Sequence, residues 1–503
     1  MRRLNALRIM CCALVLASTV RAQGTPGVNN AELRGDYALT FNGMTTGGGG
    51  ASTVFAAVGR FTADGAGNLT NGELDANSAQ PQQRAAAVAF TGTYSIGADH
   101  RGVMDLNIPG GGKLAFAMMA NGNAQFIEID ATGGIGEVGS GTMERVDTTA
   151  YSTAKILGDY AFGVAGLDGW NYRTAIAGRF TANGAGTLTD VVADVNQAGQ
   201  FTSYAMFLPA ANYTVSDTTT GRGILTLSGL LGAPPQTLNF VFYIVNSGKL
   251  FAMEIDAVTI KTPLLNGAVL QQQTPIGGFS NASLNGGMVM YLTGRAQSGC
   301  AGATGPAPNV IAGLLTADSV GGLNLTYDQN CGGAPRSVTG LPGTYSVTGN
   351  GRAAFRLGGD YMAAYLANSS TAFFIVSDSS VLFGFGEPQA AVPLTNSAVM
   401  GRYAGSTSYA ATLGVAILSG EFTADGASPT GNITGIEDIG APSGPGSGVT
   451  VNVTYSISSS PTNGRGNVAE SNGGSWIMYA VSTSKFVVVS LSDPNPAVLV
   501  FEQ

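Results

Sequence analysis

The sequence predicts an all-β protein: four tandem up-and-down antiparallel β-barrels of about eight strands each. The first observation is a repeated motif. Gly-Arg-Phe-Thr-Ala-Asp-Gly-Ala-Gly at Gly59–Gly67 returns at Gly178–Gly186 and, in altered form, at Gly313–Asp318 and Gly420–Ala427. The second is a tyrosine that follows the first glycine of each copy after 35, 35, 32 and 35 residues, namely Tyr94, Tyr213, Tyr345 and Tyr455. The third is a period of two in the apolar residues, with no helical period.

The chain begins with a predicted secretory signal peptide at residues 1–22. Arginines precede an apolar run from Ile9 to Val20, and small residues surround a cleavage point after Ala22. The run is too short for a membrane span, and no later segment is long and apolar enough. We therefore expect a secreted protein that is extracellular, at the cell surface or periplasmic.

The composition excludes several classes of protein. Apolar residues make up 44% and charged residues 11% of the chain, the reverse of a disordered composition. Removal of the signal peptide takes away four arginines and no acid, which lowers the net charge from −8 to −12. Such a chain is not expected to bind nucleic acid. We expect no cofactor and no metal.

Four units follow from the two repeated marks: residues 32–147, 155–273, 277–389 and 396–503. Short polar or proline-containing joints separate them. Each unit is large enough to bury a core of its own.

Within the first unit we expect eight strands. The alternation of apolar and polar residues is cleanest in the last unit, at Val449–Ile457. Tight turns and long loops alternate along the unit, so a meander collects the tight turns at one end and the long loops at the other. Eight strands can close into a barrel without edges. We therefore expect four barrels in a row. The predicted strands of the first unit are 36–41, 53–62, 68–74, 87–96, 102–108, 114–119, 124–129 and 140–145.

Cys300 and Cys331 are the only cysteines left after signal-peptide removal, and they predict a disulfide in the third unit. Both fall in loops expected at the long-loop end. A bridge there would stabilise the unit by roughly 3 to 4 kcal/mol.

The motifs resemble a known group of proteins. Gly-Asp-Tyr-Ala at Gly35–Ala38 and Gly158–Ala161, the two complete glycine motifs, Gly-Thr-Tyr at Gly92–Tyr94, and Phe126–Asp130 are similar to tandem lipocalin-like (calycin-like) barrel repeats of uncharacterised secreted bacterial proteins. The resemblance is strong in the first two units and weak in the others. It implies the barrel fold and no activity.

Several polar features have both a functional and a structural interpretation. The Asp64–Asn68 loop suggests calcium, but it offers one carboxylate where about six to eight oxygens are needed, so we interpret it as a hairpin turn. Glu128 with Asp130, and Glu254 with Asp256, have the pairing that carboxylate-based glycosidases use. Because Val376 and Leu491 replace the glutamate in the other units, we expect an outward polar face, with Ile127 and Ile129 inside the barrel.

The single histidine and a repeated arginine also have both a functional and a structural interpretation. His100, the one histidine, lies in a tight turn and is expected at the surface, which argues against a His-dependent catalytic triad. An arginine recurs at the start of the fifth strand of every unit. It either captures an anionic ligand or, as we expect, closes the tight end of the barrel over aromatic faces or turn carbonyls. These arginines are Arg101, Arg222, Arg352 and Arg465.

Trp170 and Tyr172 lie in the first long loop of the second unit and are the candidate ligand-binding residues. Aromatic side chains on long loops suit stacking on sugars or anchoring a partner. Alternatively, they fold over the mouth of the barrel.

We expect a non-enzymatic binding protein that uses the long-loop ends or interiors of its barrels. The ligand would be a glycan, a small apolar molecule or a protein. One alternative is a structural or adhesive spacer without a ligand, and another is a carboxylate-based glycosidase that acts with Glu128 or Glu254.

Overall fold

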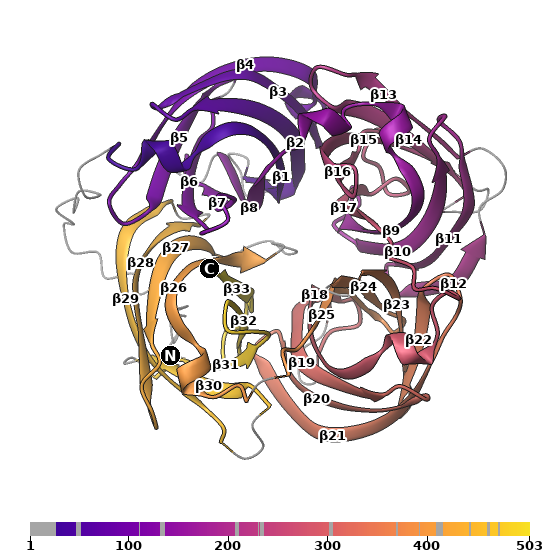
Figure 1. Ribbon diagram of the computed structural model, residues 1–503, viewed down its shortest axis with the longest axis vertical. Coiled ribbons are helices and arrows are strands. Elements are labelled where there is room, and N and C mark those ends of the chain that lie inside the picture. Colours follow the sequence, from indigo (N-terminus) through magenta and orange to yellow (C-terminus); the bar gives the residue numbers. More distant parts are fainter. Residues whose placement is uncertain are drawn as a thin grey trace, which may run out of the picture.

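The structure is a computed structural model in which four β-barrels form a ring (Figure 1). It describes residues 27–46, 52–109, 111–130, 136–206, 211–229, 231, 236–300, 305–368, 371–391, 393–408, 416–441, 444–459, 463–470 and 473–503. The predicted signal peptide lies outside these residues. Among them, no helix has the length and apolar character needed to cross a membrane.

The first barrel confirms the eight strands expected from the alternation. They pair in sequence order, all antiparallel, and β8 returns to β1 to close the barrel. The first strand is longer than predicted because it continues past the glycine at position 43. The strands are β1 (Arg34–Thr46), β2 (Ser52–Asp64), β3 (Asn68–Ser78), β4 (Ala85–Ile96), β5 (Arg101–Asn107), β6 (Lys113–Met118), β7 (Ala124–Glu128) and β8 (Gly136–Arg145).

The other three units repeat this meander. The third and fourth close completely, whereas the second is a nine-stranded sheet with β12 and β13 at its edges. An isolated bridge pairs Thr187, the residue before β11, with Asn212, the first residue of β13. The second unit contains β9 (Leu157–Leu167), β10 (Arg173–Asn183), β11 (Leu188–Gln197), β12 (Gln200–Met206), β13 (Asn212–Asp217), β14 (Arg222–Ser228), β15 (Thr237–Asn246), β16 (Lys249–Glu254) and β17 (Leu264–Gln271).

The third unit contains β18 (Asn285–Ala296), β19 (Ala307–Asp318), β20 (Gly322–Cys331), β21 (Ala334–Val347), β22 (Arg352–Leu357), β23 (Asp360–Asn368), β24 (Thr371–Val376) and β25 (Ser380–Pro388). The fourth contains β26 (Met400–Ser408), β27 (Ile417–Asp425), β28 (Gly431–Gly440), β29 (Gly446–Ile457), β30 (Arg465–Glu470), β31 (Ser475–Ala480), β32 (Lys485–Ser490) and β33 (Val498–Glu502).

Apolar side chains fill the interior of each barrel in the described part of the chain. In the first barrel Tyr37, Phe61, Phe116 and Phe126 are fully or almost fully buried, and the rings of Tyr37 and Phe61 stack 5.5 Å apart. Equivalent clusters occupy the other three interiors.

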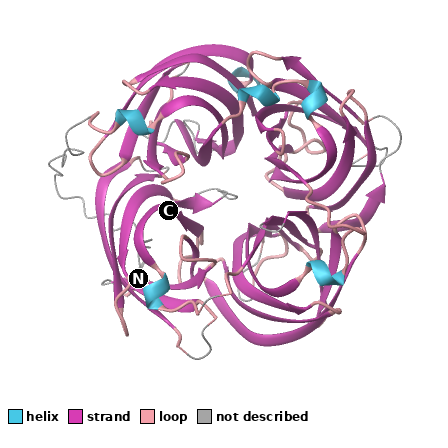
Figure 2. Ribbon diagram, in the orientation of Figure 1, coloured by secondary structure: helices cyan, strands magenta, loops and turns pink. Residues whose placement is uncertain are grey.

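A short 3-10 helix before the first strand closes the tight-turn end of each barrel (Figure 2). The repeated tyrosine holds this helix in place, because Tyr94 donates to the carbonyl of Leu33 at 2.7 Å. The same bond recurs from Tyr213 to Ile156, from Tyr345 to Leu284 and from Tyr455 to Val399. The closing helices are η1 (Asn30–Glu32), η4 (Thr153–Lys155), η5 (Asn281–Ser283) and η6 (Asn396–Ala398).

The barrels form a closed ring and do not lie in a row as expected. The recurring arginine explains the closure. Arg222 of the second barrel makes two bonds of 2.8 Å to Asp75 of the first. The same pairing joins Arg352 to Asp194 and Arg465 to Asp328, and Arg101 of the first barrel reaches Asp438 of the fourth at 2.6 Å. These arginines therefore join neighbouring barrels, a role that neither sequence interpretation included.

Each interface also buries apolar residues on the outer faces of the barrels. Strands β1 and β2 of the first barrel pack against β15, β16 and β17 of the second, with Val58 and Val241 fully buried. Equivalent clusters join the second barrel to the third and the third to the fourth. Two smaller clusters join the fourth to the first. Many strands are thus buried on both faces.

Candidate functional site

Trp170 and Tyr172 lie between β9 and β10 at the long-loop end of the second barrel. Trp170 is 66% exposed and Tyr172 is 40% exposed, so neither side chain is folded into the barrel mouth. Their rings meet edge to face, with centroids 6.3 Å apart. The two residues lie together in space and present aromatic surface outward.

Hydrogen bonds fix the backbone of this loop. The side chain of Asp168 is buried, and its Oδ1 accepts bonds of 2.8 Å from the backbone N–H groups of Trp170 and Tyr172. From the third barrel, Arg295 donates to the carbonyl of Asn171, also at 2.8 Å. The loop is therefore held from both sides.

A neighbouring loop lies against the loop of Trp170 and Tyr172. The N–H of Gly169 donates to the carbonyl of Thr259 at 3.0 Å, and Ile260, the next residue, is 43% exposed. We call Trp170 and Tyr172 the aromatic patch. The sequence indicated both aromatic residues, but not the contact between the two loops.

The two glutamates considered for acid and base chemistry point into the barrels, which corrects the expected outward face. Glu128 pairs across the ladder with the interior residue Leu114. Glu254 pairs with interior Phe240 and is completely buried. Ile127 instead lies on the outer face, packed against Ile417 of the fourth barrel. The alternation of polar and apolar residues in these strands does not distinguish the two faces, because the neighbouring barrel buries the outer face as well.

Burial changes the protonation of these glutamates. It raises the pKa of Glu254 to about 9, and nearby Asp256 contributes in the same direction. The pKa of Glu128 also lies well above its usual range, because of burial first and the charge of Asp130 second. Carboxylate oxygens of Glu128, Asp130 and Glu137 lie within 4.8 Å of one another. Three ligands are far fewer than calcium requires.

The Asp64 loop is a hairpin turn, as its sequence predicted. The Oδ1 of Asp64 accepts from the N–H groups of Ala66 and Asn68, and Gly65 and Gly67 have φ values of 79° and 114°. The side-chain and backbone bonds from Asn68, together with that from Ala66, lower the pKa of Asp64 to about 2.

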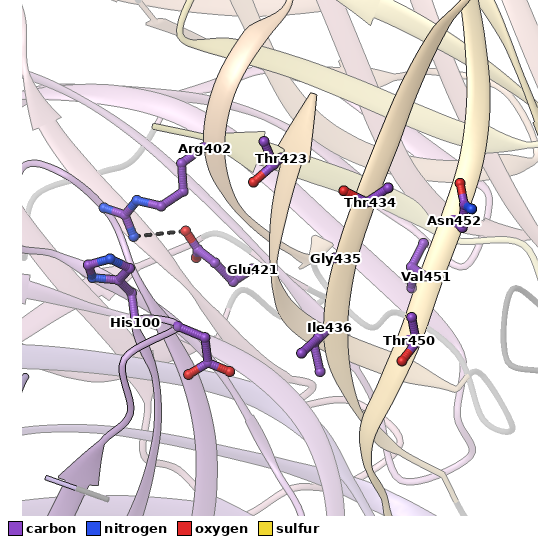
Figure 3. A pocket seen from close by; sticks show the side chains of 11 residues that line it. His100, Arg402, Glu421, Thr423, Thr434, Gly435, Ile436, Thr450, Val451 and Asn452 are labelled. Atoms are coloured by element: carbon purple, nitrogen blue, oxygen red, sulfur yellow. Dashed lines mark hydrogen bonds and ion pairs between the residues drawn. The ribbon is translucent and has the colours of Figure 1, made fainter. Parts of the chain in front are cut away.

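A groove of about 500 Å³ lies between the fourth and first barrels (Figure 3). Asp99 and His100 of the first barrel line one part of it, and Arg402 and Glu421 project from the fourth. His100 lies in the predicted turn, with Nδ1 2.7 Å from Glu32 Oε1. Figure 3 shows threonine and asparagine side chains on the strands across from this charged group, namely Thr434, Thr450 and Asn452.

Glu421 has the most strongly shifted pKa among the groups that line this groove. Its Oε1 accepts a 2.8 Å bond from Arg402, whereas the buried Oε2 has no partner among the described residues. Burial raises the pKa of Glu421 to about 8 although Arg402 opposes the shift. A carboxyl group, a guanidinium and several hydroxyls equip the groove to hydrogen-bond a polar ligand.

A matching groove of about 440 Å³ lies between the second and third barrels, with the charges reversed. There Asp159 occupies the position of Arg402, and Arg179 occupies that of Glu421. Both grooves lie near the tight turns. Sequence reasoning missed them because it directed attention to the long-loop end, although the exchange of Asp and Arg for Arg and Glu is visible in the aligned repeats.

Cys300 and Cys331 form the predicted disulfide, with Cα atoms 5.6 Å apart. It joins the loop after β18 to the end of β20. A disulfide fits an extracellular or periplasmic protein.

Comparisons with known proteins give no family. No family model matches the chain, and no curated protein matches it. Among solved structures, a double mutant of the vaccine antigen transferrin binding protein B from Haemophilus parasuis Hp5 is 12% identical, with 92% of this chain and 94% of that chain covered and a TM-score of 0.17. A single mutant of the same antigen is 10% identical, with 78% and 85% covered and a TM-score of 0.17. At these TM-scores the likeness carries no argument about function.

Proposed function

We propose that the chain is an exported, non-enzymatic binding protein whose aromatic patch binds carbohydrate. Residues 1–22 act as the signal peptide. The units at residues 32–147, 155–273, 277–389 and 396–503 form one ring, which holds the patch in a fixed orientation. The Cys300–Cys331 disulfide supports folding in an oxidising compartment.

The observation that carries this proposal is an exposed tryptophan on a loop that is held rigidly. Burial of a tryptophan side chain stabilises a fold, because the ring has a large apolar surface. The exposed Trp170 does not contribute this stabilisation. The bonds from Asp168 and Arg295 restrain the loop before any ligand arrives. Restraint of this kind reduces the entropy lost on binding, so the geometry suits recognition.

The described interiors and the patch favour carbohydrate over a small apolar molecule. Apolar side chains fill the barrel interiors, which argues against an apolar ligand inside them. The patch is small and open, and two rings at a wide angle suit the apolar face of a sugar, with its hydroxyls left in water.

Binding to immobilised polysaccharides tests this proposal. We expect the mature protein to be retarded in affinity gels that contain a polysaccharide which the Trp170→Ala variant no longer recognises. Leu157→Ala is the matched control, because Leu157 is 55% exposed at the start of β9, whose other end leads into the Trp170 loop. Equal retardation of the wild type and Trp170→Ala across a glycan panel would contradict the proposal and favour a spacer.

The glycosidase alternative receives no support from the geometry. A general acid or nucleophile must touch the scissile bond, but the side chain of Glu254 is completely buried and that of Glu128 nearly so.

A further inference from the structure

Three interior positions near the long-loop end distinguish the fourth barrel from the others. The first of these positions lies on the third strand of each barrel. It is equivalent in all four barrels because it pairs with the first glycine of the repeated motif on the second strand. The three positions hold Leu74, Leu106 and Leu114 in the first barrel, Ala193, Leu227 and Phe240 in the second, and Tyr327, Leu357 and Met362 in the third. In the fourth barrel they hold Glu437, Glu470 and Trp476.

Glu437 is the central member of this group. It pairs with Gly420 on the interior side of β28 and is completely buried. Neither of its carboxylate oxygens has a hydrogen-bond partner in the described part of the chain. An isolated buried carboxylate is strongly unfavourable, whereas the apolar residues at this position in the other barrels carry no such cost.

Glu470 and Trp476 complete the group. Glu470 pairs with interior Val453 at the end of β30, where the chain turns at the long-loop end. Trp476 is buried, and its Nε1 donates to Glu470 Oε1 at 2.6 Å. This bond fixes the indole ring beside the carboxylate.

The carboxyl groups of Glu437 and Glu470 interact electrostatically. Burial is the main cause that raises the pKa of Glu437 to about 8, and the negative charge of Glu470 adds to the shift. A cation bound beside the Glu437 carboxylate would be attracted to both negative charges and would satisfy the unpartnered oxygens of Glu437.

We propose that the long-loop end of the fourth barrel binds the ammonium group of a small organic amine, with Glu437 as its buried counter-ion. Glu470 supplies a second carboxylate, and the buried Trp476 ring beside it supplies an aromatic wall for the cation. A divalent metal fits less well. The two oxygens of Glu437 and the one Glu470 oxygen not bonded to Trp476 make three, where calcium takes six to eight.

Tryptophan fluorescence provides a direct test, since the chain has two tryptophans. In the Trp170→Phe variant Trp476 is the only tryptophan, so selective excitation of the indole ring reports on Trp476 alone. We expect 2-phenylethylamine, titrated to about 10 mM at neutral pH, to change this emission saturably. The neutral analogue 2-phenylethanol should change it at least about tenfold more weakly, because it lacks the charge.

Two further variants separate binding from folding. Glu437→Gln in the Trp170→Phe background keeps the shape of the side chain and should weaken amine binding about tenfold or more. Glu254→Gln is the matched control, because Glu254 is equally buried in the second barrel. Near-ultraviolet circular dichroism checks that each variant is folded.

The proposal is overturned if the amine causes no saturable change, if 2-phenylethanol binds equally well, or if folded Glu437→Gln retains wild-type affinity. A saturable response to calcium without one to the amine also overturns it. Since Trp170 is already replaced, these outcomes are independent of carbohydrate binding at the aromatic patch.

Discussion

Arg101 of the first barrel donates from Nη1 to Asp438 Oδ2 of the fourth barrel at 2.6 Å, and both side chains are 3% exposed. This pair closes the ring between barrels that are farthest apart in the sequence. At the other three interfaces the arginine uses two nitrogens on the aspartate, and a tyrosine hydroxyl donates to the same aspartate. At the closing interface Arg101 Nε instead bonds Asp99 of its own barrel, and Ala117 occupies the place of that tyrosine.

Asp438→Asn is expected to open the ring. Loss of one member of a buried pair costs roughly 3 to 5 kcal/mol, and the fourth and first barrels are not consecutive in the chain. Small-angle X-ray scattering should show a larger radius of gyration. Asp194→Asn is the control, since a short joint connects the second and third barrels. An unchanged radius for Asp438→Asn would show that the apolar contacts alone hold the closing interface.

The Arg402–Glu421 pair should tolerate exchange for the charges of the matching groove. Arg402→Asp and Glu421→Arg each place like charges together, so both single variants should lower the melting temperature. The double variant restores the arrangement of Asp159 and Arg179 and should recover stability, with a coupling energy of roughly 1 kcal/mol or more. Strictly additive losses in the double-mutant cycle would refute this coupling.

Glu437→Gln should change how stability depends on pH. The pKa of Glu437 is about 8 in the folded state and about 4.3 when unfolded, so the folded state binds more protons between these values. The wild type therefore loses stability as pH rises from about 4.5 to 8. The Glu437→Gln variant lacks this contribution. The difference between its urea midpoint and that of the wild type should therefore shift in favour of the variant as pH rises over the same range. A constant difference between pH 5 and pH 8 would contradict the prediction.

Reduction of the Cys300–Cys331 bond should destabilise the third barrel by roughly 3 to 4 kcal/mol, because the bridge spans 31 residues. Thermal unfolding with and without dithiothreitol measures this. The Cys300→Ser/Cys331→Ser variant serves as the control and should not respond to the reductant. A wild-type melting curve that is insensitive to complete reduction would argue against a stabilising role.

Asp168→Ala should loosen the aromatic patch without removing an aromatic ring. In a Trp476→Phe background Trp170 is the single tryptophan, and its steady-state anisotropy should fall when Asp168 no longer accepts from the two loop N–H groups. Asp217→Ala disrupts a similar turn elsewhere in the barrel and should leave the anisotropy unchanged. Equal anisotropy in both variants would mean that Arg295 and Thr259 suffice to hold the loop.

Local sequence signals were enough to predict the strands and turns of the first barrel. The alternation at residues 87–96 and the glycines after Asp64 act over a few residues, so they indicate structure without knowledge of distant neighbours. The disulfide was also predictable, because only two cysteines remained to pair. Of the candidate sites, the loop sequence predicted Trp170 and Tyr172 as ligand-binding residues, and nothing in the sequence interpretation indicated the grooves.

The sequence by itself determined four repeated all-β units, the glycine-containing turns and the place of each repeated arginine and tyrosine. Only the tertiary structure decided that the units close into a ring, that the arginines join neighbouring barrels, and that Glu128, Glu254 and Glu437 face inward. The physical reason is that strands at the interfaces between barrels are buried on both faces. A period of two separates the two faces but does not say which one is the barrel interior and which one meets the next barrel.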